Sequence, residues 1–173
     1  MSVREIITND RAALSVPSLS VAIFDATLRK LLGDLADTLE AHDGFGLAAP
    51  QVGVRERCCV LALPPDTKQW GAARVGEQVL VGLVPIVNPV IVWHGRVRAV
   101  ADEGCLSFPG QRIPIRRYVA VRVQANMTDG TPFEILASGE VARAFQHEID
   151  HFDGKTIFDR QDPRFRPRLR GED

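Results

Sequence analysis

The chain has 173 residues, of which 45% are hydrophobic and 25% charged, and its formal net charge is −1. This length suits one domain with its own hydrophobic core, and the composition is that of a globular protein rather than a disordered one. The nearly neutral balance gives no general reason to expect nucleic acid or an acidic membrane as partner. We therefore expect a single domain over residues 1–173, with an N-terminal arm at 1–24 and a tail rich in Arg and Pro at 160–173.

The cysteines and the N-terminal segment indicate the compartment. Three cysteines without regular spacing do not make a disulfide framework, which is typical of a reducing environment. Residues 1–15 mix acidic and basic side chains and lack the apolar segment of a secretory signal. No apolar run approaches the roughly 18 residues that a membrane helix needs. These features predict a cytoplasmic protein.

The first strong helical pattern follows Asp25, a suitable N-cap. Leucines then recur at the spacing of one helical face, at Leu28, Leu31, Leu32, Leu35 and Leu39. Asp43 and Gly44 end the pattern, and Gly44 is the expected residue just beyond the C-cap. We predict a structural helix whose leucine face covers a sheet.

A segment rich in glycine and alanine follows at residues 44–53, with the sequence GFGLAAPQVG. Glycine there lets the backbone approach another group closely. Gln51 offers an amide donor and a carbonyl acceptor from the same segment. Taken alone, the pattern favours a turn between a helix and a strand, with Gln51 exposed. A phosphate-binding loop is excluded, because no Gly-Lys-Ser/Thr follows.

An apolar run at residues 57–63 predicts a buried strand. Cys58 and Cys59 are adjacent in it, so their side chains should point to opposite faces, as small buried residues.

Weaker patterns lie between this strand and the next motif. Residues 64–78 carry no motif and predict a loop. Residues 80–93 are mostly apolar but contain Pro85 and Pro89, which is typical of an edge strand or a bent pair of strands. Residues 96–101 predict a further short strand.

Cys105 stands in the segment DEGCLSFPG, residues 102–110, which is typical of a shaped loop rather than of a core strand. A lone cysteine of this kind is most often a small buried residue. Glu103 is either a solvated charge or a partner for Arg117, and the sequence does not decide between these alternatives.

Alternating valines at residues 117–124 predict a half-buried strand. Asp129 and Gly130 predict a two-residue turn, after which residues 133–136 return as the hairpin partner.

The last predicted helix carries the sequence QHEIDH at residues 146–151. His147 and His151 are spaced i and i+4, so both imidazoles leave one helical face and can bind one divalent cation. Glu148 reaches the same region without being a ligand, which suits a general base for metal-bound water. Chance is the alternative, because the pattern fixes few positions. With Cys105 as third ligand, the fourth position would stay open, as in catalytic sites.

Together these elements predict an α+β domain, in which several antiparallel strands surround a central metal-binding helix and a second, N-terminal helix packs outside. The tail at residues 160–173 interleaves arginines with two prolines, which disfavours a long helix. It is either a solvated chain end or a transient contact with RNA or the ribosome.

The chain resembles the peptide deformylase family in three motifs, at residues 44–51, 103–107 and 146–151, and in outline over residues 25–160. The resemblance implies the α+β fold of that family. It also implies hydrolysis of the formyl group from the N-terminal formyl-methionine of nascent polypeptides, which releases formate.

The resemblance also implies a ligand set and a cofactor. Cys105, His147 and His151 match the family's metal ligands, for one divalent metal per chain. Fe2+ is the expected native ion, and Zn2+, Ni2+ or Co2+ can occupy the site; the donor set by itself does not choose among them.

Further residues match the family's catalytic and substrate-binding positions. Glu148 matches the general acid and base that acts on metal-bound water. The side chain of Gln51 and the backbone N–H of Leu106 match the pair that stabilises the oxyanion. Other positions are expected to contact the substrate: Phe45, Gly46 and Gly104 in the peptide channel, and Ala144 and Phe145 as walls of the methionine pocket.

The chain also departs from the family pattern. Glu140 stands where the family usually carries a large apolar residue near the substrate pocket, and it either points to solvent or alters side-chain preference. Phe45 is bulkier than the usual aliphatic residue and could narrow the channel. The tail lacks the long C-terminal helix that some bacterial deformylases use on the ribosome, so that contact is not carried over.

Two other classes of protein stay open. A zinc peptidase shares the His-Glu-x-x-His pattern, but its third ligand is commonly a downstream His or Glu, whereas Cys105 lies upstream. A protein that binds formylated peptides without turnover would not need Glu148, whose presence argues for catalysis.

Overall fold

The computed structural model describes residues 2–165, so most of the predicted tail, residues 166–173, lies outside the described residues. Its α-helices are α1 (Arg11–Leu14), α2 (Ala26–Ala41), α3 (Thr67–Trp70) and α4 (Gly139–Phe152), and its 3-10 helices are η1 (Ala49–Val52) and η2 (Pro163–Phe165). The strands are β1 (Gly46–Ala48), β2 (Cys58–Leu63), β3 (Ala73–Val75), β4 (Gln78–Leu80), β5 (Gly82–His94), β6 (Arg98–Glu103), β7 (Ile113–Tyr118), β8 (Ala120–Asn126) and β9 (Pro132–Ser138). Within residues 2–165, no helix is long and apolar enough to cross a membrane.

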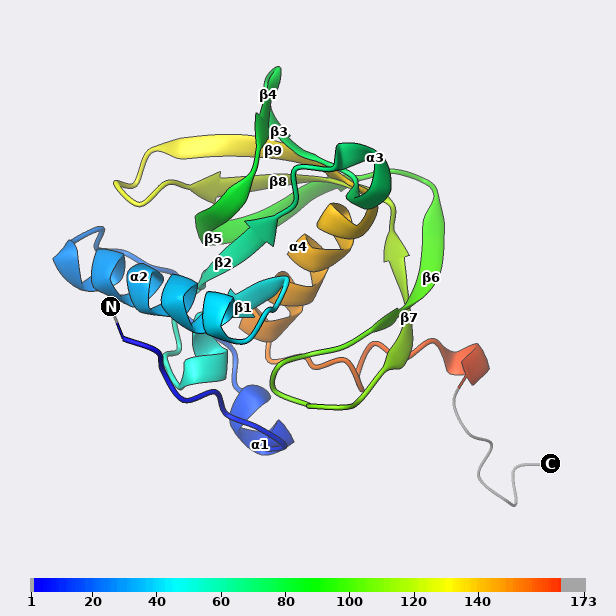
Figure 1. The fold of residues 1–173 in the computed structure, drawn as a ribbon, viewed down its shortest axis with the longest axis horizontal. Helices are drawn as coiled ribbons and strands as arrows, with labels where there is room; N and C mark the ends of the chain where they lie inside the picture. Colours follow the sequence, from blue (N-terminus) through cyan, green and yellow to red (C-terminus); the bar gives the residue numbers. More distant parts are fainter. Residues whose placement is uncertain (1, 166–173) are drawn as a thin grey trace.

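The strands of the described chain form a seven-stranded antiparallel sheet, in the order β1-β2-β5-β8-β9-β3-β4, and a separate ribbon of β6 and β7. Figure 1 shows α4 in the middle of the molecule, with the large sheet on one side and the β6–β7 ribbon on the other. α2 lies outside, along β1 and β2. The predicted α+β arrangement around a central helix is therefore confirmed.

Hydrophobic side chains fill the two faces of the sheet separately. The first core cluster joins α4 to the sheet and includes Cys59, Phe145 and Phe152. The second joins the leucine face of α2 to the other face and includes Cys58 and Leu35. Adjacent residues of a strand point to opposite faces, so the two cysteines fall into different clusters, as predicted.

The C-terminal end of α2 packs closely against the loop that carries Cys105. The helix ends with His42 as C-cap, and Asp43, rather than the expected Gly44, adopts the left-handed conformation with φ +50°. Gly44 serves a different purpose. A Cβ on it would lie 2.7 Å from Leu39 Cδ1 and 2.8 Å from Leu106 Cδ1, so any side chain here would force these two leucines to move.

β5 is one strand that bends. Its first half pairs with β2 and its second half with β8, and the register shifts between Val87 and Val90. Asn88, with φ +51°, and Pro89 lie at this shift. Pro85 lies in the half that pairs with β2 alone, so its missing N–H removes no bond from a second neighbour.

The predicted loop at residues 64–78 and the predicted strand at residues 117–124 are wrong in detail. Residues 64–78 contain α3 and β3 rather than only a loop, because elements of three or four residues are too short to show periodicity. Residues 117–124 are not one strand. The chain leaves β7 after Tyr118 and enters the large sheet at Ala120, and the Val119 N–H bonds to Val97 O at the crossing.

The hairpin of β8 and β9 lies where predicted, but its turn is longer. The Met127 N–H bonds to Thr131 O, and the Gly130 N–H bonds to Met127 O, which leaves a three-residue loop instead of a two-residue turn. Gly130 has φ +91°, a conformation that favours glycine.

The N-terminal arm packs on α2. Arg4 forms an ion pair with Asp34 at 2.8 Å, and the Arg4 N–H bonds to Thr38 Oγ1 at 2.9 Å. Leu14 of α1 is fully buried.

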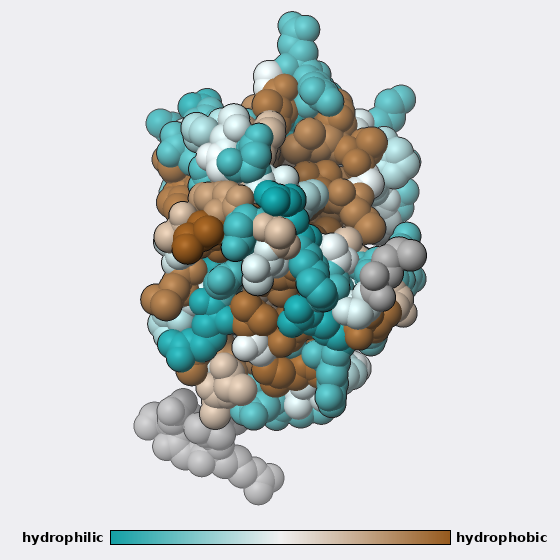
Figure 2. Space-filling view, turned by 90° about the vertical axis from the view of Figure 1, so that its left-hand side faces the viewer, coloured by the Kyte–Doolittle hydropathy of each residue, from teal (hydrophilic) through white to brown (hydrophobic). Residues whose placement is uncertain are grey.

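Part of the outer surface is apolar. In Figure 2 hydrophobic side chains gather in the upper half of the face shown. Large exposed hydrophobic residues on and beside β5 include Val81, Leu83, Val90 and Trp93. These four do not line the cavity described below.

Candidate metal centre and cavity

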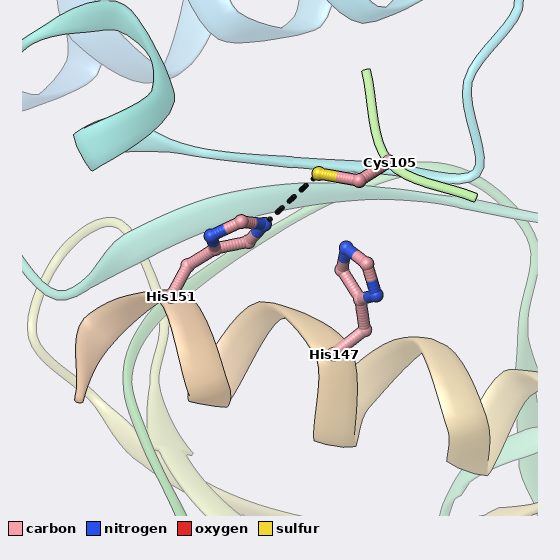
Figure 3. A group of neighbouring side chains, drawn as sticks. All are labelled: Cys105, His147 and His151. Atoms are coloured by element: carbon pink, nitrogen blue, oxygen red, sulfur yellow. Dashed lines mark hydrogen bonds between the residues drawn. The ribbon is translucent and has the colours of Figure 1, made fainter. Parts of the chain in front are cut away.

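Two histidines of α4 and one cysteine converge behind a cavity. His147 and His151 lie one turn apart, with ring centroids separated by 5.0 Å. Cys105 follows β6 and reaches them from the other side, so that one ligand atom from each residue lies within 4.8 Å of the others. Figure 3 shows the sulfur and the two rings facing a common space. The i, i+4 spacing therefore brings both imidazoles to the same face of α4, as the sequence predicted.

The donor set fits a divalent metal ion. Sγ of Cys105 lies 3.4 Å from Nε2 of His151, close to the separation of two ligands that bind one ion at 2.0–2.3 Å. His147 uses Nδ1 for a hydrogen bond to Glu103, which leaves Nε2 for a metal. One thiolate and two imidazoles leave a fourth position open, as in catalytic rather than structural sites.

Glu103 is a buried partner of Arg117 rather than a solvated charge, which decides between the two alternatives. Arg117 donates to both of its oxygens, at 2.8 and 2.9 Å, and His147 Nδ1 lies 3.0 Å from Oε2. Burial raises the pKa of the Glu103 carboxyl, but the bonds from Arg117 and then His147 outweigh it and hold the pKa well below its ordinary value. An ionised Glu103 accepts a hydrogen bond, so Nδ1 of His147 is the protonated nitrogen.

Gln51 is buried and only 1% exposed. The sequence pattern taken alone favours a turn with Gln51 exposed, and that prediction is wrong. It lies in η1, where its Oε1 accepts the Ala48 N–H at 2.9 Å. This bond fixes the amide so that Nε2 faces Ser107 Oγ at 3.1 Å and Cys105 Sγ at 3.5 Å. A hydrogen-bond donor is thus held beside the metal-ligand group.

Glu148 is 3% exposed and packs against the backbone of Gly46. Its Oε2 has no hydrogen-bond partner within the described residues, although it is buried. Burial raises the pKa of the Glu148 carboxyl to about 7. A buried carboxylate with a free oxygen is a chemically available acceptor and donor of protons.

A cavity of about 560 Å³ opens in front of these groups, within the usual range for small-molecule sites. It is lined by most of the residues that the sequence singled out: Phe45, Gly46, Gln51, Gly104, Cys105, Leu106, Ala144, His147 and Glu148. His151 lies behind it and is 1% exposed.

Phe145 does not belong to the lining residues. It is 1% exposed and packs in the core between α4 and the sheet. Successive residues of a helix are about 100° apart, and this rotation turns Phe145 from the cavity side of α4 toward the sheet. Of the two expected pocket walls, the structure places only Ala144 there.

Sequence reasoning missed Trp70, Arg143 and the exact place of Glu140, all of which line the cavity. The ring of Trp70 lies 5.9 Å from that of Phe45. Glu140 is only partly exposed and lies 3.0 Å from Nε of Arg143, so it does not simply point to solvent. No motif marked Trp70 or Arg143, because each is brought to the cavity by packing of α3 and α4.

The chain is similar to known proteins over nearly its whole length. The family model described as polypeptide deformylase matches residues 3–166. The peptide deformylase of Thermomicrobium roseum is 40% identical over 164 residues, which is 95% of this chain and 89% of that protein.

Solved structures agree with the sequence comparison. The peptide deformylase of Ehrlichia chaffeensis in complex with actinonin superposes with a TM-score of 0.83 at 36% identity, and covers 94% of this chain and 91% of that one. The class I type b peptide deformylase of Acinetobacter baumannii with bound Met-Ala-Ser superposes with a TM-score of 0.80 at 27% identity. The match covers 92% of this chain and 99% of that one.

Proposed function

Because the chain belongs to the peptide deformylase family, metallohydrolases that remove the N-formyl group from nascent peptides, we propose that this reaction takes place in the cavity beside Cys105, His147 and His151. The substrate is the formyl-methionine at the N-terminus of a new polypeptide. The C–N bond of the formamide breaks, water adds to its carbon, and formate and a free amine are released. The observation that carries the assignment is the convergence of three metal donors with the buried Glu148 at one cavity.

Cys105, His147 and His151 would hold one divalent metal per chain. The donor set accepts Fe2+, Zn2+, Ni2+ or Co2+, and Fe2+ as the ion used in the cell rests on the family resemblance. A metal bound here supplies Lewis-acid polarisation of the formyl oxygen and lowers the pKa of water.

Glu148 moves the protons. Its Oε2 has no other partner in the described structure and belongs to a cavity-lining side chain. Glu148 takes a proton from the attacking water and later delivers it to the leaving amine nitrogen, so one carboxyl serves as base and then as acid.

Gln51 and the backbone N–H of Leu106 stabilise the negative oxygen that develops on the formyl carbon. The side chain of Gln51 is preoriented by the Ala48 N–H, and both residues line the cavity beside Cys105. Preorganised donors of this kind typically contribute about 10²–10³ in rate each.

The peptide lies along the remaining cavity wall. Phe45, Gly46 and Gly104 border its path, and Ala144 forms part of the pocket for the methionine side chain. Phe145 contributes only indirectly, by packing α4 against the sheet. The Met-Ala-Ser bound to the Acinetobacter baumannii enzyme indicates a peptide of the expected class.

Formate release tests the proposal. Protein purified without oxygen is assayed with formyl-Met-Ala-Ser, and its metal content is measured on the same sample. We expect turnover with about one metal per chain, abolished by a chelator and restored by added Fe2+ or Co2+. Full metal occupancy without formate release would instead favour a protein that binds formylated peptides without turnover.

A further inference from the structure

Arg143 lies one turn before His147 on α4 and is 9% exposed. Nη1 of its guanidinium donates to Glu103 Oε1 at 3.0 Å and to Ile115 O at 3.1 Å. Nη2 donates to Ala99 O at 3.3 Å. Arg143 therefore ties α4, which carries both histidines, to β6 and β7, from which the loop with Cys105 extends.

The four hydrogen bonds to Glu103 fill its acceptor capacity. Oε1 accepts from Arg117 Nε at 2.8 Å and from Arg143 Nη1 at 3.0 Å. Oε2 accepts from Arg117 Nη2 at 2.9 Å and from His147 Nδ1 at 3.0 Å. A carboxylate has about four acceptor positions, so each oxygen is saturated and the group has one favoured orientation.

We propose that Arg143 is a positioning residue for the metal centre, which acts through Glu103 to fix the ring of His147. The inference rests on the proposed metal site. Without Arg143, Oε1 keeps a single donor in a buried place, and the carboxylate can restore a second bond only by turning away from its present orientation. That rotation loosens the bond to Nδ1 and with it the direction of Nε2.

Glu140 supports this arrangement from the cavity side. Its Oε2 lies 3.0 Å from Nε of Arg143, so the guanidinium lies between two carboxylates, one buried and one at the cavity. The chain Glu140–Arg143–Glu103–His147 thus runs from the cavity wall to a metal ligand. An arginine that merely formed part of the wall would need no bond to Glu103.

Metal affinity distinguishes an Arg143 that positions His147 through Glu103 from an Arg143 that only forms part of the cavity wall. In Arg143→Leu we expect Zn2+, measured by competition with a chelator, to bind about 10-fold more weakly. This is the low end of the effect of losing a direct partner of a metal ligand, because Arg143 acts one residue further out, through Glu103. The visible absorption of the Co2+-loaded protein should also change, because it reports ligand geometry. Arg122→Leu is the matched control, because Arg122 forms an ion pair with Glu134 on the surface, at 3.3 Å, and lies over the ring of Trp93. This control variant should bind metal as wild type does.

A double-mutant cycle tests whether the effect passes through Glu103. In a Glu103→Gln background, Arg143→Leu should weaken Zn2+ binding far less than in wild type, because the two residues then no longer act together. An equal loss in both backgrounds would overturn the proposal, as would wild-type Zn2+ affinity and Co2+ absorption in Arg143→Leu with only KM changed. If Arg143→Leu does not fold, Arg143→Lys enters the same cycle, with a smaller loss expected. Metal binding is read without substrate, so failure of the proposed reaction would show separately, as absent formate release in metal-loaded wild type.

Discussion

Glu148 packs directly on the backbone of Gly46, so closely that a Cβ at residue 46 would lie 2.4 Å from its Oε1. β1, which carries Gly46, also contacts α4, which carries Glu148. The absence of a side chain at this one position is therefore what lets the carboxylate face the cavity from a buried site.

Gly46→Ala should lower formate release without removing the metal. The new methyl group cannot share space with Oε1, so Glu148 must shift, and a displacement of about 1 Å in a catalytic group can cost about 10²-fold in rate. kcat/KM for formyl-Met-Ala-Ser and metal content per chain are the two measurements.

Gly33→Ala is the matched control. Gly33 lies on the exposed side of α2, and a Cβ there meets no atom within 4 Å. Replacing glycine by alanine inside a helix stabilises by roughly 0.5–1 kcal/mol, so this variant should keep full activity and unfold at a slightly higher temperature. Equal activity in Gly46→Ala and Gly33→Ala would show that Glu148 tolerates the displacement or takes no part in the reaction.

Glu148→Gln should abolish most turnover and keep the metal. The amide is nearly the same size but cannot accept and return a proton, and positioned acid–base groups contribute typically about 10²–10⁴-fold. Formate release is compared with wild type at equal metal occupancy. Unchanged turnover in the metal-loaded variant would exclude Glu148 as the base.

Cys105→Ser should weaken metal binding. A serine hydroxyl is a poorer ligand than a thiolate for the ions expected here. Elemental analysis after dialysis is expected to show less than one metal per chain, and formate release should fall with the metal content. A variant with full occupancy after the same dialysis would remove Cys105 from the ligand set.

The two histidines of the candidate metal centre could be predicted because their signal is local. His147 and His151 lie on one helix, where the spacing alone determines which side chains meet. Cys105 joins them through tertiary folding, and in the sequence it was supported by its loop and by the family resemblance. The opposite directions of Cys58 and Cys59 were predictable for the same local reason, the period of a strand.

The missed features all depend on tertiary packing. Trp70 reaches the cavity because Gly71 packs tightly on the junction of β9 and α4, where a Cβ would lie 2.1 Å from Ser138 O. Arg143 looks like an ordinary charged residue of a helix until its partners on β6 and β7 are known. The break at Val119 is invisible as well, since the alternation of valines continues where the chain moves from one sheet to the other.

Asp34, which lies away from the cavity, makes the free energy of unfolding depend on pH. Hydrogen bonds from Lys30, then Arg4 and Ser2, lower the pKa of its carboxyl below the ordinary value. A carboxyl whose pKa is depressed in the folded state stabilises the fold above its unfolded pKa, about 3.9, and loses that contribution as the pH falls toward the folded value.

Asp34→Asn should therefore unfold at lower denaturant concentration than wild type at pH 7, and the difference between the two proteins should shrink as the pH falls below about 4. Asp37→Asn on the same helix is the control, because the described residues offer Asp37 no ion pair. Its free energy of unfolding should stay close to that of wild type throughout. Urea titrations of the three proteins between pH 7 and pH 3 provide the measurement. A difference for Asp34→Asn that stays constant over this range would mean that the arm is held on α2 by packing rather than by the charge of Asp34.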